Sequence, residues 1–132
     1  MLSEAEIAVR RPVWVALSEL WLDTELQDRD LTHIARVLHD SGYGRETLEA
    51  ILFGEVAPVV YRNLYSVAGE WIGFDEDWLC GEIRGALRRR GRLGRWLLRC
   101  RRRTMTWPVL EDWQEVLRRH DALAEDADRT SP

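Results

Sequence analysis

The sequence contains no lysine, and all 19 of its basic residues are arginine. A GC-rich genome, whose codons favour arginine, accounts for this composition. Arginine differs from lysine because its planar guanidinium can donate two parallel hydrogen bonds to one carboxylate or phosphate. The composition therefore permits specific charged contacts without locating any of them.

Long apolar stretches are also missing. The longest uninterrupted run, Val13–Leu17, is far shorter than the roughly 20 residues that a helix needs to cross a bilayer. The segment Met1–Glu6 is acidic, whereas a secretory signal begins with basic residues. We therefore expect no membrane association and a cytoplasmic location. The only two cysteines, Cys80 and Cys100, are then expected to stay reduced rather than form a bridge.

The common catalytic motifs are absent. The sequence has no His-Glu-x-x-His pair, no glycine-rich phosphate loop and no Cys-x-x-Cys pair. Its three histidines are scattered, and the six-residue separation of His33 and His39 does not place them on one helical face. We therefore expect a protein without catalytic residues, bound metal or cofactor.

Four carboxylates could still gather around metal ions in a helical bundle. They lie near expected helix ends: Asp23, Glu25, Glu55 and Glu70. Ferritin-like metal sites also require Glu-x-x-His pairs, and the sequence contains none. We expect Glu55 and Glu70 to cap helices or to pair with arginines such as Arg62 instead.

What is present is the composition of a folded protein. Of the 132 residues, 45% are hydrophobic and seven are tryptophan, which is enough to bury a core without a disulfide or a metal. Apolar residues recur at helical spacing, and no convincing period-two stretch predicts a strand. We predict an all-α, compact, single-domain bundle of about five to seven helices, with residues 1–125 as the domain and 126–132 as a frayed tail.

Local signals place the helix ends. Ser3 begins a capping-box pattern that opens a helix to about Leu22. Pro12 either kinks that helix or begins a second one. Asp28 is expected to cap the next helix, and Gly42 to end it in the left-handed conformation. Pro58 is expected to interrupt the helix that follows.

Further residues are predicted to face the interior because they share a helical stripe with other apolar residues. Near the N-terminus Trp14 only flanks such a stripe. The residues predicted to face inward include Val13, Leu17, Leu20, Ile34, Leu38, Leu48, Ile51, Leu52, Trp78, Ile83, Trp96, Leu110, Trp113 and His120.

Charge is distributed unevenly along the chain. Residues 1–83 carry 6 arginines and 16 acidic residues, residues 84–103 carry 10 arginines and no acidic residue, and residues 104–132 carry 3 and 7. The basic stretch could bind nucleic acid or another anionic partner. Its arginines could equally pair with acidic residues of the same chain. The candidate basic patch comprises Arg88, Arg89, Arg92, Arg95, Arg99 and Arg102.

The acidic part of the chain could complement a basic partner. Its carboxylates cluster around the first two expected interhelical breaks: Asp23, Glu25, Asp28, Asp30, Asp40, Glu46 and Glu49. Ordinary solubilising charge explains them equally well. A second candidate contact, with Glu70, Trp71 and Phe74, lies in the glycine-flanked segment 69–75. Those rings could instead plug the end of the bundle.

Several segments resemble a family of small helical bacterial proteins of unknown function. They are Trp14-Val15-Ala16-Leu17-Ser18, Leu22-Asp23-Thr24-Glu25, Glu55-Val56-Ala57-Pro58-Val59 with Asn63-Leu64, and the strongest block, Ala68-Gly69-Glu70-Trp71-Ile72-Gly73-Phe74. The resemblance covers roughly residues 10–85. It implies a helical bacterial fold and carries over no catalytic residue.

We therefore expect a non-enzymatic protein that binds another protein. The most specific hypothesis is an immunity protein, similar in role to an antitoxin, that neutralises a bacterial competition toxin by covering its active site. The alternative is a nucleic-acid-binding or regulatory module that uses the 84–103 segment. The sequence leaves the oligomeric state open.

Overall fold

The computed structural model describes residues 3–22, 26–64, 76–91, 96 and 109–130. All regular structure in these residues is helical, which confirms the predicted all-α, single-domain bundle of five to seven helices. The elements are α1 (Glu4–Leu22), α2 (Asp28–Asp40), α3 (Arg45–Ile51), the π-helical turn η1 (Leu52–Val56), α4 (Ala57–Leu64), α5 (Glu76–Arg89) and α7 (Leu110–Thr130). None of the described helices combines the length and apolar composition that a bilayer crossing requires.

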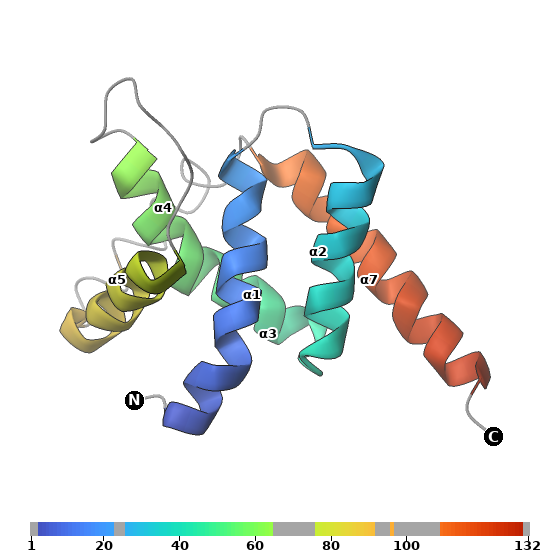
Figure 1. Cartoon of the computed structure of the whole chain (residues 1–132), viewed down its shortest axis with the longest axis horizontal. Coiled ribbons are helices and arrows are strands. Elements are labelled where there is room, and N and C mark those ends of the chain that lie inside the picture. Colours follow the sequence, from blue (N-terminus) through green and yellow to red (C-terminus); the bar gives the residue numbers. More distant parts are fainter. Residues whose placement is uncertain (1–2, 23–25, 65–75, 92–95, 97–108, 131–132) are drawn as a thin grey trace.

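The first helix, α1, is the centre of the bundle and contacts α2, α4, α5 and η1 (Figure 1). Its start follows the predicted capping pattern, because the backbone N–H of Glu6 donates to Ser3 Oγ at 3.2 Å. Pro12 lies inside one continuous helix and does not begin a second one. Pro12 is exposed, so the backbone hydrogen bond that proline cannot make is missing on the solvent side.

The cap of α2 differs from the sequence prediction by one residue. Gln27 is the N-cap and Asp28 is the first helical residue, while Asp30 accepts a hydrogen bond of 3.0 Å from the Gln27 backbone N–H. The carboxylate that closes this cap is therefore Asp30 and not Asp28. Beyond α2, Gly42 has φ +80°, which confirms its predicted left-handed conformation.

The expected break at Pro58 takes the form of a wide helical turn. The helical path continues from α3 through η1 into α4, and the Ala57 N–H donates to the carbonyl of Leu52, five residues earlier. Pro58 then occupies the first turn of α4 and has no N–H to offer the carbonyl of Gly54, four residues earlier, which accepts a hydrogen bond from Arg90 instead. The π-helical turn thus joins α3 to the proline-containing helix α4 with no loop between them.

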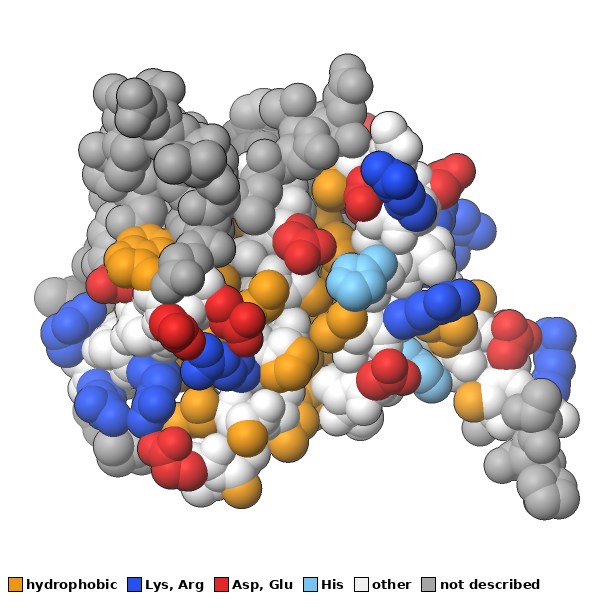
Figure 2. Space-filling view, viewed as in Figure 1, with side chains coloured by type: hydrophobic (Ala, Val, Ile, Leu, Met, Phe, Trp, Pro, Cys, Tyr) orange, Lys and Arg blue, Asp and Glu red, His pale blue; other side chains and the backbone are white. Residues whose placement is uncertain are grey.

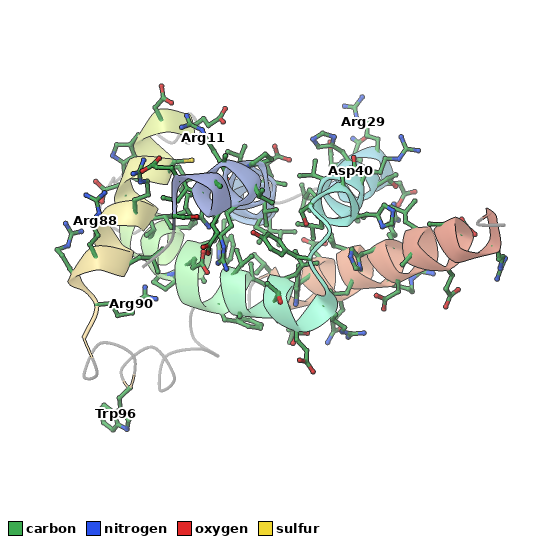
Figure 3. All side chains as sticks on the ribbon, turned by 90° about the horizontal axis from the view of Figure 1, so that it is seen from below. Arg11, Arg29, Asp40, Arg88, Arg90 and Trp96 are labelled. Carbon is green, nitrogen blue, oxygen red and sulfur yellow. The ribbon has the colours of Figure 1, made fainter. Side chains whose placement is uncertain are left out.

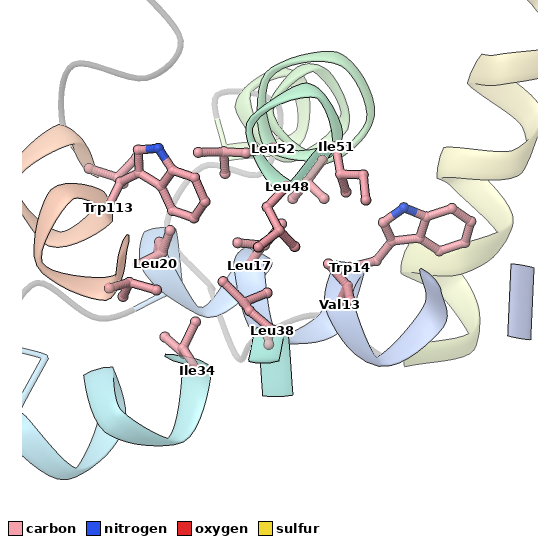
Figure 4. Packing of buried hydrophobic residues seen from close by; sticks show 14 of the residues in the cluster. Val13, Trp14, Leu17, Leu20, Ile34, Leu38, Leu48, Ile51, Leu52 and Trp113 are labelled. Atoms are coloured by element: carbon pink, nitrogen blue, oxygen red, sulfur yellow. The ribbon is translucent and has the colours of Figure 1, made fainter. Parts of the chain in front are cut away.

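The core lies where α1 meets α2, α3 and η1. Figure 4 shows Trp14 at one end of it and Trp113 of α7 at the other, with Leu17, Leu48 and Leu52 between them. Both indoles are almost completely buried, so Trp14 is a core residue although its position in the sequence only flanks the apolar stripe. Each such side chain contributes roughly 1.5–3 kcal/mol to folding.

Three predicted inward residues are exposed instead. Trp96 is 60% exposed, Leu110 is 42% exposed and Trp78 is 38% exposed. Leu110 is the first residue of α7 and Trp78 lies in the first turn of α5, where the helical stripe has no neighbour to cover it completely. Helical spacing alone could not show this, because it does not indicate where the packed neighbours end.

The last helix, α7, is attached to the bundle mainly through α2. Arg119 donates to the carbonyl of Asp28 at 2.8 Å, to Thr32 Oγ1 at 2.7 Å and to the Asp28 carboxylate at 2.9 Å. Arg119 also bonds Glu115, and hydrogen bonds from Arg118 and Arg119 lower the pKa of Glu115 to about 2. The helix extends to Thr130, past the predicted start of the 126–132 tail, and its end projects from the bundle in Figure 1.

Alanine substitutions at two glycines, one in the α2–α3 turn and one inside α5, test the backbone conformation of that turn. Gly42→Ala should destabilise the protein by about 1 kcal/mol, because alanine is strained at positive φ although no atom lies within 4 Å of the added Cβ. Gly81→Ala is the matched control, since Gly81 lies inside α5 with equal space around it. It should stabilise by up to about 1 kcal/mol. Urea unfolding measures both, and changes of the same sign would contradict the assignment.

Candidate functional site

Two of the predicted acidic contact residues are partly neutralised by arginines of the same chain. Asp28 is paired with Arg119, with 2.9 Å between Arg119 Nη2 and Asp28 Oδ1. Asp30 caps α2 and has Arg29 Nε at 4.0 Å. These carboxylates have structural roles at the start of α2. Asp23 and Glu25 lie outside the described residues.

The remaining predicted acidic residues come together where α2, α3 and α7 meet. Asp40 ends α2 and Glu46 lies in the first turn of α3, on the two sides of the intervening turn. Both are exposed and neither has an ion-pair partner in the part of the chain that the structure describes. Arg45 lies 3.7 Å from Glu49 and 3.3 Å from Asp121 of α7.

We name this group the acidic corner and define it as Asp40, Glu46, Glu49 and Asp121. Two of its carboxylates, those of Glu49 and Asp121, lie beside the guanidinium of Arg45, and Asp40 and Glu46 stand on the two sides of the α2–α3 turn. Asp121 is not among the acidic residues predicted from the sequence, because it is 76 residues from Arg45 in the chain and only the packing of α7 brings the two together. No local pattern could have identified it.

Two histidines lie beside the acidic corner. His120 of α7 is mostly buried, and its ring centroid is 6.2 Å from that of His39 on α2. His120 Nδ1 is 3.3 Å from the carboxylate of Asp121. Within the described residues no three His, Cys, Asp or Glu side chains are placed to hold a metal ion. The histidines therefore form a packing contact between α2 and α7.

The described part of the basic patch divides into paired and unpaired arginines. Arg84, just before the patch, bonds Glu4 of α1 at 2.8 Å. Arg88 and Arg89 are exposed, and neither has an ion-pair partner among the described side chains. The other predicted members of the patch, Arg92, Arg95, Arg99 and Arg102, lie outside the described residues.

The surface that joins α1 to α5 carries both signs of charge. Arg11 of α1 pairs with Glu76 at 3.0 Å and with Asp77 of α5. Figure 2 shows acidic and basic side chains next to one another on this face, with apolar side chains exposed between them. The largely exposed pairs contribute little to stability. The uneven charge of the sequence therefore becomes partly mixed on the folded surface.

Glu55 is largely buried, and its carboxylate links neighbouring helices. Its carboxylate accepts hydrogen bonds from Arg10 and, at 2.9 Å, from Trp14 Nε1. The Arg10 guanidinium also lies 5.5 Å from the ring centre of Tyr43. Burial alone would lower the pKa of Arg10, but the hydrogen bond and charge of Glu55 outweigh it, so the pKa is raised. Glu55 thus pairs with an arginine, as expected, and the partner is Arg10.

The other candidate residues give no site that can be described. The predicted contact residues Glu70, Trp71 and Phe74 lie outside the described residues. Cys80 is a buried free thiol, and burial raises its pKa, which disfavours the reactive thiolate. The acidic corner and the Arg88–Arg89 end of α5 remain as the candidate binding surfaces.

Comparison with known proteins identifies a family without an assigned activity. The family model described as a domain of unknown function (DUF7079) matches residues 8–119. This range includes the segments over which the sequence resembles a family of unknown function, and it confirms that resemblance. No curated protein and no solved structure matches the chain.

Removing the Glu55 carboxylate tests its structural role. Glu55→Ala should destabilise the protein by about 3 kcal/mol or more, because it leaves the largely buried Arg10 charge and the Trp14 N–H without a partner. Asp77→Ala, which breaks an exposed pair with Arg11, is the control and should cost less than about 1 kcal/mol. Thermal and urea unfolding measure both changes. Equal losses of unfolding free energy in the two variants would show that the buried pair stabilises the fold no more than the exposed pair does.

Proposed function

We propose that this chain, which belongs to the family described as a domain of unknown function (DUF7079), is a non-enzymatic protein that binds another protein. Specifically, we propose an immunity protein that neutralises a toxin used in competition between bacteria. The observation that supports this proposal is the acidic corner. Its exposed carboxylates Asp40 and Glu46 have no ion-pair partner within the residues that the structure describes.

The acidic corner is suited to a cationic partner because it is held by packed helices. Leu38 and Leu48, one on each side of the α2–α3 turn, are fully buried. Arg45 links α3 to α7 through Asp121. This packing fixes the backbone from which Asp40 and Glu46 project, so a partner does not have to order that backbone on binding. The field of these carboxylates also accelerates the approach of a positively charged surface.

The proposed mechanism is occlusion. A toxin that acts on nucleic acid needs a basic surface for its substrate, and the acidic corner would dock on that surface and exclude the substrate. The corner would act by charge and shape and would catalyse nothing. The proposal includes a bacterial, cytoplasmic location, because such a toxin meets its substrate there.

Coexpression with the product of the adjacent gene tests the proposal. That product should be toxic alone, and this chain should restore growth and copurify with it. Asp40→Asn with Glu46→Gln should slow association about tenfold at low salt, with a smaller change in the dissociation rate, because exposed charges act mainly during encounter. Stopped-flow or surface-based kinetics measure both rates.

The matched control removes the same charge elsewhere. Glu111 and Glu125 of α7 are exposed and have no ion-pair partner in the described chain, so Glu111→Gln with Glu125→Gln changes the net charge equally. An equal slowing would show that overall charge, and not the acidic corner, drives association. An adjacent gene product that is neither toxic nor bound would contradict the proposed function itself.

A further inference from the structure

The last two arginines of α5, Arg88 and Arg89, differ from Arg84 of the same helix in having no ion pair within the described residues. Arg84 pairs with Glu4, so it behaves as an internal partner for the acidic residues of the chain. Arg88 and Arg89, one turn further along α5, have no ion-pair partner among the described side chains and are exposed. The guanidinium of Arg89 lies over Gly85 of its own helix, where an added Cβ would be 3.3 Å from Arg89 Nη1. These charges remain available to an external anion.

An exposed indole follows these arginines in the chain. Trp96 is 60% exposed, the highest value among the large hydrophobic side chains that the structure describes. In the sequence it stands between Arg95 and Leu97, with Arg92 and Arg99 within four residues. Figure 3 shows Arg88, Arg90 and Trp96 one below another on the α5 side of the molecule, at a distance from Asp40. Arg88 and the exposed indole of Trp96 are therefore remote from the acidic corner.

We infer that Arg88, Arg89 and Trp96 form a binding surface for single-stranded nucleic acid. Exposed guanidiniums bind phosphate oxygens through charge-assisted hydrogen bonds, and an exposed indole offers a face on which an unpaired base stacks. In a duplex the base faces are already stacked on each other, so an exposed indole favours a single strand. An acidic protein would use the arginines but would gain little from the ring.

The net charge of −4 does not oppose this assignment at short range. Charges more than about 8–10 Å from a phosphate are largely screened at physiological ionic strength. The field at the end of α5 is therefore set by nearby arginines. The inference stands on different residues from the proposed immunity function, and either can fail without the other.

Fluorescence anisotropy with a labelled 20-nucleotide oligothymidine tests the inference on the full chain. Binding should be detectable at 25 mM NaCl and should weaken as salt rises. Arg88→Glu with Arg89→Glu should weaken it at least tenfold and make the log–log salt slope shallower by about 1.4, which is two phosphate contacts at about 0.7 each for a single strand. No binding at 25 mM NaCl would overturn the inference.

The control reverses the charge at two arginines of α2, one without an ion-pair partner among the described residues and one weakly paired. Arg36 is exposed without an ion-pair partner in the described chain, and Arg29 is 84% exposed with its nearest carboxylate at 4.0 Å. Arg29→Glu with Arg36→Glu changes the net charge by the same amount as the α5 reversal. It should leave oligothymidine binding within about twofold of the parent protein. Equal weakening by both double variants would overturn the assignment to α5.

Two substitutions separate stacking from charge. Trp96→Ala should weaken binding about tenfold and Trp96→Phe should restore most of it, because a phenyl ring still stacks on a base. Circular dichroism verifies that each variant is folded. Unchanged affinity in Trp96→Ala, or tighter binding of a duplex or of polyglutamate than of the single strand, would contradict a single-stranded nucleic-acid surface.

Discussion

The interior hydrogen bonds of Glu55 connect the central helix to the wide turn beside it. The carboxylate comes from η1 and accepts from Arg10 and Trp14, which lie one turn apart on α1. Arg10 also meets Tyr43 from the α2–α3 turn. A charge in this position must be paired, because an unpaired buried ion is strongly destabilising. The pair therefore favours the arrangement of α1, η1 and the α2–α3 turn that satisfies both partners.

The other helices are arranged around the apolar side chains of α1, which they bury. The neighbours of α1 are α2, η1, α4 and α5, and Trp14 and Trp113 occupy the two ends of the core. Arg119 holds α7 against the beginning of α2, and Arg45 holds the middle of α7 against α3. Of the two, Arg45 is the one that contacts carboxylates of the acidic corner, those of Glu49 and Asp121.

Arginine is the only cation of this chain, and its guanidiniums divide into two groups. Arg10, Arg11, Arg45, Arg84 and Arg119 satisfy carboxylates of the same molecule. Arg88 and Arg89 do not, among the side chains that the structure describes. The carboxylates divide in the same way: Asp28 and Glu55 are paired, whereas Asp40 and Glu46 have no ion-pair partner in the parts of the chain that are described. Each proposed binding surface therefore includes charges without an ion-pair partner in the described part of the chain: Asp40 and Glu46 at the acidic corner, and Arg88 and Arg89 on α5.

The sequence by itself determined the helical class, the capping at Ser3, the left-handed Gly42 and a change of helix at Pro58, because each depends on a few adjacent residues. It also located the charge-rich segments. It did not determine that the change at Pro58 is a π-helical turn in a continuous path. Tertiary structure alone decided that Trp14 is buried and Trp96 exposed, that Glu55 pairs with Arg10, and that Asp121 joins Arg45 across 76 residues. Helical spacing defines the faces of a helix, but whether a face is covered, and by which charges, depends on neighbours that are distant in the chain.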